Sequence, residues 1–195
     1  MSESSLFTIF LTMAITSNFI IVQFLGLCPF FGITKRLRDA FSMGIALLIV
    51  MVVASAAGWL ITEYVLIPYD VVYLNNVVYI LVIATLVQIT EMYIKRTNAA
   101  MYNSFGIYLA LITTNCAVLG IMFINLKENF SLIQSMGAAA GGAAGFILLL
   151  SVMAGIREKL DIADPPKSFK GLPQAILVAA ILGLAFYGFA GVIKV

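Results

Sequence analysis

The sequence contains no histidine, only two cysteines and few charged residues. Of its 195 residues, 10% are charged and 63% are hydrophobic, whereas soluble domains are about a quarter charged and about half apolar. So few charges cannot cover a water-facing surface, which excludes a soluble enzyme. The net charge of +2 is small, and the basic residues are scattered among connections, which excludes nucleic acid as a partner. We therefore expect an integral membrane protein in contact with lipid.

The N-terminus lacks the basic segment and the small-residue cleavage site of a removable signal peptide. Only Glu3 precedes the apolar run that begins at Leu6, so we expect this run to be retained in the membrane. The rest of the chain leaves no room for a soluble catalytic domain. We therefore treat residues 1–195 as a single membrane domain.

Six apolar segments follow one another, at 6–34, 40–62, 71–94, 104–126, 131–155 and 172–193. Each is long enough for the ~20 residues that cross a ~30 Å hydrocarbon core. Because backbone groups at that depth must pair internally, we expect helices. The sequence therefore predicts an all-α membrane protein with six transmembrane helices.

Basic residues concentrate in the connections that follow the first, third and fifth segments. These odd connections hold nine of the eleven, namely Lys35, Arg36, Arg38, Lys95, Arg96, Arg157, Lys159, Lys167 and Lys170. By the positive-inside rule the odd connections are cytoplasmic. Both termini are then expected on the outer side of the membrane.

Two short motifs recur half a chain apart. Residues 16–19 read TSNF and residues 113–116 read TTNC, and a Met-Gly pair opens the following segment in both halves. Three helices per half would invert the second half relative to the first, a known membrane architecture. We predict two inverted repeats, at about 1–98 and about 99–195, with chance similarity of two apolar segments as the alternative.

The first and fourth segments are expected to be broken. The uncharged residues 6–34 would form a helix of ~43 Å, too long for the membrane core. Gly26 and Pro29 predict a break near 26–29, since proline should bias Cys28 away from helical angles. In the fourth segment, Thr114 and Asn115 place polar groups beside Cys116 near mid-membrane. A break in the first helix would bring Cys28 to the same depth.

The two cysteines beside the two predicted breaks allow three interpretations of their role. Each could be a small buried hydrophobe, the pair could form a disulfide, or the thiolates could bind iron–sulfur, zinc or copper(I). Mid-membrane burial and the absence of a secretory pattern argue against the disulfide. A [2Fe–2S] cluster usually takes four cysteines, so on the metal reading another chain must supply two more ligands.

Several stretches are similar to one known family. FLGLCPFFGITKRL (24–37), QITEM (88–92), LITTNCAVLG (111–120), IREKL (156–160) and LAFYGFAGVIKV (184–195) resemble the A-type membrane subunits of the Rnf complex. That complex is the ion-translocating ferredoxin:NAD oxidoreductase of bacteria. The D- and E-type subunits of the sodium-translocating NADH:quinone oxidoreductase are similar. The resemblance covers essentially the whole chain.

The resemblance implies a function and a set of partners. Two homologous six-helix subunits of opposite orientation pair in the bacterial inner membrane, and each supplies two cysteines, here Cys28 and Cys116, to one shared [2Fe–2S] cluster. The chain would relay electrons across the bilayer with coupled sodium or proton transport, beside an E-like partner and B-, C-, D- and G-like subunits. It would bind neither NAD nor flavin and would not be catalytic alone.

Other polar residues have structural and functional readings. Asn18, Asn115 and Thr114 are expected to support the breaks or the cluster, and interhelical hydrogen bonding is the alternative. Glu91 is expected to pair with Lys95, with a role for Glu91 and Gln88 in an ion path as the weaker alternative.

Two other functions stay open. Inverted repeats and broken helices are equally typical of a small secondary transporter without a redox centre. The glycines at 137, 141 and 145 share a helix face and indicate close helix packing, so a pure packing subunit is the third reading.

Overall fold

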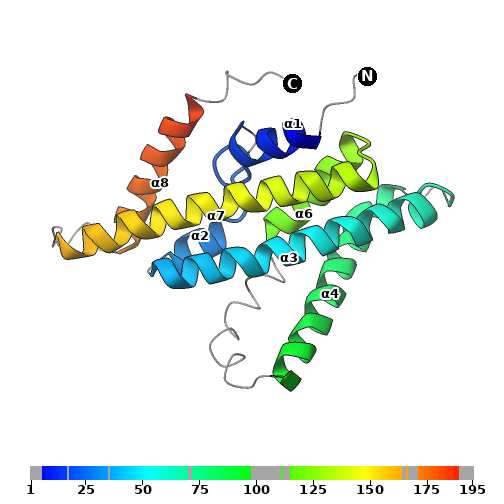
Figure 1. Ribbon diagram of the computed structural model, residues 1–195, viewed down its shortest axis with the longest axis horizontal. Helices are drawn as coiled ribbons and strands as arrows, with labels where there is room; N and C mark the ends of the chain where they lie inside the picture. Colours follow the sequence, from blue (N-terminus) through cyan, green and yellow to red (C-terminus); the bar gives the residue numbers. More distant parts are fainter. Residues whose placement is uncertain are drawn as a thin grey trace.

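The computed structural model describes residues 6–16, 18–34, 36–69, 72–97, 111, 115–163, 166 and 171–188. Within these residues every regular element is helical, which confirms the all-α prediction for that part (Figure 1). The elements are α1 (Leu6–Leu11), the π-helix η1 (Thr12–Thr16), α2 (Leu27–Ile33), α3 (Leu37–Ile61), the π-helix η2 (Thr62–Leu66), the 3-10 helix η3 (Val72–Leu74), α4 (Asn75–Thr97), α6 (Cys116–Lys127), α7 (Leu132–Ile162) and α8 (Leu172–Tyr187).

Two helical stretches are long and apolar enough to cross a membrane, Leu37–Leu66 and Leu132–Ile162. The other apolar helices in the described part are shorter, at Leu6–Thr16, Asn75–Ile89, Cys116–Lys127 and Leu172–Phe186. These features agree with a membrane protein. The count of six spans and their inverted relation remain predictions.

The long helices α3 and α7 lie side by side at the centre of the molecule, and α1 flanks α7 on the opposite side (Figure 1). They run antiparallel, because Leu37 at the start of α3 meets Glu158 near the end of α7, whereas Ser55 near the end of α3 meets Ser135. Gly44 permits this approach, since a Cβ there would lie 2.5 Å from Cγ1 of Ile147.

The glycine face of α7 packs inside the fold. A Cβ at Gly137 would meet Leu6, one at Gly141 would meet the backbone of Phe10, and one at Gly145 would meet the backbone carbonyl of Ala14. Small residues allow this close contact, which replaces the hydrophobic driving force that is absent between helices in lipid. The packing interpretation of these glycines is confirmed, and their partner is the α1–η1 segment of the same chain.

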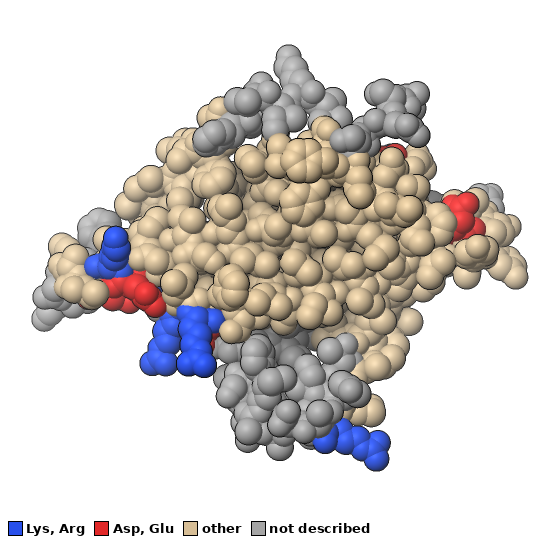
Figure 2. Space-filling view, viewed as in Figure 1, with Lys and Arg blue, Asp and Glu red and all other residues tan. Residues whose placement is uncertain are grey.

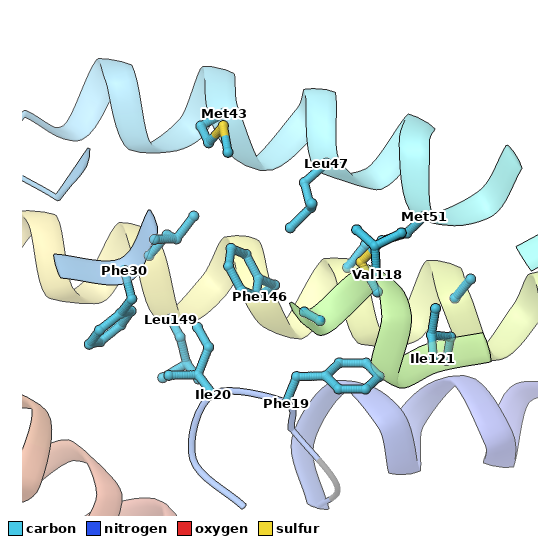
Figure 3. Close-up of a cluster of buried hydrophobic side chains, with 14 of the residues drawn as sticks. Phe19, Ile20, Phe30, Met43, Leu47, Met51, Val118, Ile121, Phe146 and Leu149 are labelled. Atoms are coloured by element: carbon cyan, nitrogen blue, oxygen red, sulfur yellow. The ribbon is translucent and has the colours of Figure 1, made fainter. Parts of the chain in front are cut away.

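A cluster of buried apolar side chains joins α2, α3, α6 and α7 to the segment that follows η1 (Figure 3). Its members point toward one another and include Phe19, Ile20, Phe30, Met43, Leu47, Met51, Val118, Ile121, Phe146 and Leu149. The cluster fixes the two short helices α2 and α6 between the two long ones.

On the face shown in Figure 2, charged side chains lie at the two ends of the α3–α7 pair and near the end of α4, and the surface along α3 and α7 between their ends is uncharged. At one end Arg157, which is 9% exposed, donates to the carbonyl oxygen of Phe31 (3.0 Å) and to Oγ1 of Thr34 (2.9 Å). Glu158 accepts from the backbone N–H of Leu37 at 2.9 Å. The start of α3 and the end of α7 therefore meet at one end of the molecule, and the side of the membrane on which this end lies stays a prediction.

Candidate functional site

The first apolar segment is broken between η1 and α2, where Asn18 replaces missing backbone partners. The side chain is 1% exposed, its Oδ1 accepts from the N–H of Ile20 at 3.1 Å, and its Nδ2 donates to the carbonyl oxygen of Ala14 at 3.1 Å. A buried backbone group without a partner costs about as much as a lost hydrogen bond. These two hydrogen bonds satisfy backbone groups beside the break, and the predicted supporting role of Asn18 stays a prediction.

Gly26 ends this loop and begins α2. Its φ of 80° lies in the left-handed region, and a Cβ would overlap the ring of Phe146. Glycine adopts this conformation without steric cost and leaves room for the ring. This conformation agrees with a role of Gly26 in the break, and that role stays a prediction.

The predicted role of Pro29 is wrong. Cys28 and Pro29 are the second and third residues of α2, so Pro29 does not hold Cys28 out of a helical conformation. The first N–H groups of a helix have no intrahelical partner, and a proline in the first turn therefore costs no hydrogen bond. The chain is non-helical before Cys28, from residue 18 to 26.

The second break places Asn115 directly before α6. Asn115 has extended backbone angles (φ −76°, ψ 113°) and its Oδ1 accepts from the N–H of Ala117 at 3.0 Å, a side-chain N-cap. Asn18 makes the same bond two residues along its own chain. The N-cap agrees with the supporting role predicted for Asn115, which stays a prediction, and Thr114 lies outside the described residues.

The two breaks meet in space. The backbone N–H of Gly26 donates to Sγ of Cys116 at 2.9 Å, and a Cβ at Gly120 in α6 would lie 2.5 Å from Leu25 of the first loop. Cys28 follows Gly26, the donor of this hydrogen bond, by two residues along the chain. Both thiols are free; Cys28 is exposed and Cys116 is partly buried.

The donor set at this place fits half of an iron–sulfur site. Two free thiols beside a backbone N–H donor offer soft ligands with an outer hydrogen bond, which is how proteins hold and tune such clusters. Among the described residues no group of three or more His, Cys, Asp or Glu side chains gathers to hold a metal. A four-thiolate site would therefore need two ligands from another chain, and the thiol of Cys28 is exposed.

The candidate ion-path residues lie on α4. Gln88 is exposed there, and the side chains of Glu91 and Lys95 lie outside the described residues. The predicted ion pair and the predicted ion path therefore stay predictions. The sequence analysis treated Arg157 only as a charge that sets the orientation, and it missed the hydrogen bond from Arg157 to the end of α2. The available signal was an arginine near the predicted end of an apolar helix, because arginine side chains can bind the last carbonyl groups of a helix.

Comparison with known proteins assigns the family. Residues 6–193 match the model of the Rnf-Nqr subunit, membrane protein family. The chain is 45% identical to the A-type subunit of the ion-translocating oxidoreductase complex of Syntrophotalea carbinolica, over 97% of this chain and 98% of that one. It is 44% identical to the protein of that name from Photorhabdus laumondii, over 96% and 97% of the two chains. The matches span almost the full length of each protein, and the chain belongs to the Rnf-Nqr family of membrane subunits.

Proposed function

We propose that this chain is the A-type membrane subunit of a bacterial ion-translocating oxidoreductase complex, in which Cys28 and Cys116 supply two of four thiolate ligands to an intramembrane [2Fe–2S] cluster. The hydrogen bond from the N–H of Gly26 to Sγ of Cys116 carries the proposal. It joins the end of the first break, two residues before Cys28, to the thiol of Cys116 at the second break, a contact that a packing subunit would not require. The names of the relatives agree with a redox complex.

The remaining ligands would come from a homologous membrane subunit of opposite orientation, the E-like partner. Cys28 is exposed on α2, and ligand counting requires a second chain at this place. Other subunits, B-, C-, D- and G-like, would carry electrons from ferredoxin toward NAD. This chain itself offers neither a nucleotide site nor a flavin site in the proposal.

When bound, a [2Fe–2S] cluster supplies one-electron transfer, and the residues of this chain would set its surroundings. The N–H of Gly26 points at a ligand sulfur and stabilises negative charge there. Asn115 is 4% exposed, and its Nδ2 has no hydrogen-bond partner among the described residues. That amide is a second donor available to the site. The buried apolar cluster around Phe146 excludes water from the same region.

The proposal includes six membrane helices in two inverted three-helix repeats, with both termini outside. The matching side-chain bonds of Asn18 and Asn115 support two related halves. The shared end of the first and fifth connections supports the orientation. Coupled transport of sodium or protons belongs to the same proposal and rests on the family.

A double substitution of both cysteines by serine separates this proposal from a redox-free transporter. The variant complex, assembled with all subunits and reconstituted in proteoliposomes, should lose ferredoxin-driven NAD reduction. A transporter would keep solute or ion movement without a redox partner. The stoichiometry of the subunits after size-exclusion chromatography is the control for assembly. An assembled variant with unchanged NAD reduction would refute the proposed role of the cysteines.

A further inference from the structure

A cavity of about 100 Å³ with both polar and apolar lining residues lies at the end of the α3–α7 pair opposite Arg157. The last turns of α3 and α6, the π-helix η2 and the first half of α4 line it. Its polar lining includes Ser55, Trp59, Thr62, Glu63, Tyr79 and Asn125. One water needs about 10–15 Å³ of such volume, so the cavity has room for a small ion with part of its hydration shell.

The hydroxyl hydrogens of this cavity are already used. Ser55 donates to the carbonyl oxygen of Ser135 at 3.0 Å, and Thr62 donates to the carbonyl oxygen of Gly58 at 2.8 Å. Thr62 and Tyr79 are 2.7 Å apart, and because the only proton of Thr62 is committed, Tyr79 is the donor of that bond. The indole N–H of Trp59 donates to the carbonyl oxygen of Phe130 at 2.9 Å.

Asn125 supplies the acceptor that is left over. Its Nδ2 donates to Oγ of Ser55 at 2.7 Å. Because Ser55 gives its only proton to the carbonyl oxygen of Ser135, Oγ of Ser55 can only accept from Asn125, and this fixes the orientation of the Asn125 amide. Asn125 is 7% exposed, and its Oδ1 has no hydrogen-bond partner among the described residues. A buried carbonyl without a partner costs about 1–3 kcal/mol. An occupant that contributes positive charge or protons would remove this cost.

We infer that this cavity binds a partly hydrated sodium ion through the carbonyl oxygen of Asn125 and the free lone pairs of Ser55, Thr62 and Tyr79. An anion is disfavoured because the buried hydroxyls of Ser55, Thr62 and Tyr79 present lone pairs and not protons. A divalent ion is disfavoured because Glu63 is the one carboxylate among the described lining residues, and hard divalent ions take several. Neutral oxygens with one carboxylate at an exposed position suit a hard monovalent cation.

This site would give the proposed ion translocation a binding point at the outer end of the chain. Only the role of this site in ion translocation rests on the proposed function. Sodium binding at the cavity needs neither Cys28 nor Cys116. The cavity lies at Ser55 and beyond along α3, whereas the cysteine site contacts Phe146 in the middle of α7. Ion binding and cluster binding are therefore separable by experiment.

Trp59 makes the test direct, because it is the only tryptophan of the chain and it lines the cavity. The full chain in lipid nanodiscs is titrated with NaCl against choline chloride at constant ionic strength while indole emission is recorded. A saturable change specific to sodium is expected. The Cys28→Ser, Cys116→Ser variant should give the same curve, so loss of the cluster function leaves this test intact.

Three variants complete the experiment. Asn125→Leu should abolish the sodium response, and circular dichroism checks its folding. Glu63→Gln changes an exposed residue and should weaken apparent sodium affinity about tenfold, which corresponds to ~1.4 kcal/mol. Glu128→Gln, an exposed acid at the same end outside the cavity lining, should bind as wild type. No saturable response to sodium in the wild type, an equal response to choline, or wild-type affinity in Glu63→Gln would overturn the inference and leave water as the occupant.

Discussion

Replacement of Gly145 by alanine tests the packing that holds the first break in place. A Cβ at this position would overlap the carbonyl oxygen of Ala14 and would lie 2.6 Å from Nδ2 of Asn18. Both atoms belong to one hydrogen bond, from Asn18 to Ala14, so neither yields without breaking it. Overpacking of this kind costs about 1–3 kcal/mol, against a gain of ~1 kcal/mol from alanine in a helix.

Gly155→Ala is the matched control, since Gly155 lies in the same helix and a Cβ there meets nothing within 4 Å. The intrinsic helix gain is common to both variants, so their difference isolates the steric cost of about 1–3 kcal/mol. The assay is denaturation of the purified full chain in detergent micelles, followed by circular dichroism. If Gly145→Ala proves as stable as Gly155→Ala, α7 does not approach η1 as described here.

Three further variants probe the cysteine region. Gly26→Ala should lower iron content, since alanine at φ 80° costs about 1 kcal/mol or more and its Cβ would displace Phe146. Arg157→Met should destabilise the chain by about 1–3 kcal/mol in thermal unfolding, because the buried Thr34 hydroxyl and the end of α2 lose their donor. Asn115→Ser keeps an N-cap but removes the amide donor, so the reduction potential of a bound cluster should fall while stability changes little.

Each of these variants has its own control. Gly32→Ala in α2, where a Cβ meets nothing within 4 Å, should retain iron, and equal loss in both glycine variants would contradict the special role of Gly26. Lys159→Met removes an exposed charge at the Arg157 end and should leave the melting temperature near that of wild type. An unchanged potential in Asn115→Ser, measured by redox titration, would remove this amide from the cluster environment.

The sequence was sufficient for the helical class, the two breaks and the packing face. Glycine readily adopts the left-handed conformation seen at Gly26, and asparagine is a preferred N-cap, as seen at Asn115. Both preferences are local and can be predicted from the sequence. The glycine stripe of α7 was equally readable, because spacing alone puts those positions on one face. Pro29 misled the prediction because the same residue breaks a helix interior and suits a first turn.

Contacts between segments that are far apart in the sequence could not be predicted from it. The bond between Gly26 and Cys116 joins residues 90 positions apart, and Asn125 meets Ser55 across 70 positions. The polar residues of the cavity come from three different stretches of the chain, with Ser55 and Thr62 in the first, Tyr79 in the second and Asn125 in the third. Only the packing of α3, α4 and α6 brings these side chains together.

Iron and acid-labile sulfide analysis of the complete complex, purified without oxygen, tests the central claim most directly. The cysteine site predicts that Cys28→Ser and Cys116→Ser complexes each lack the iron and sulfide of one [2Fe–2S] cluster relative to wild type, and lack its electron paramagnetic resonance signal after reduction. Fully assembled variants with the iron, sulfide and spectrum of the wild type would contradict it.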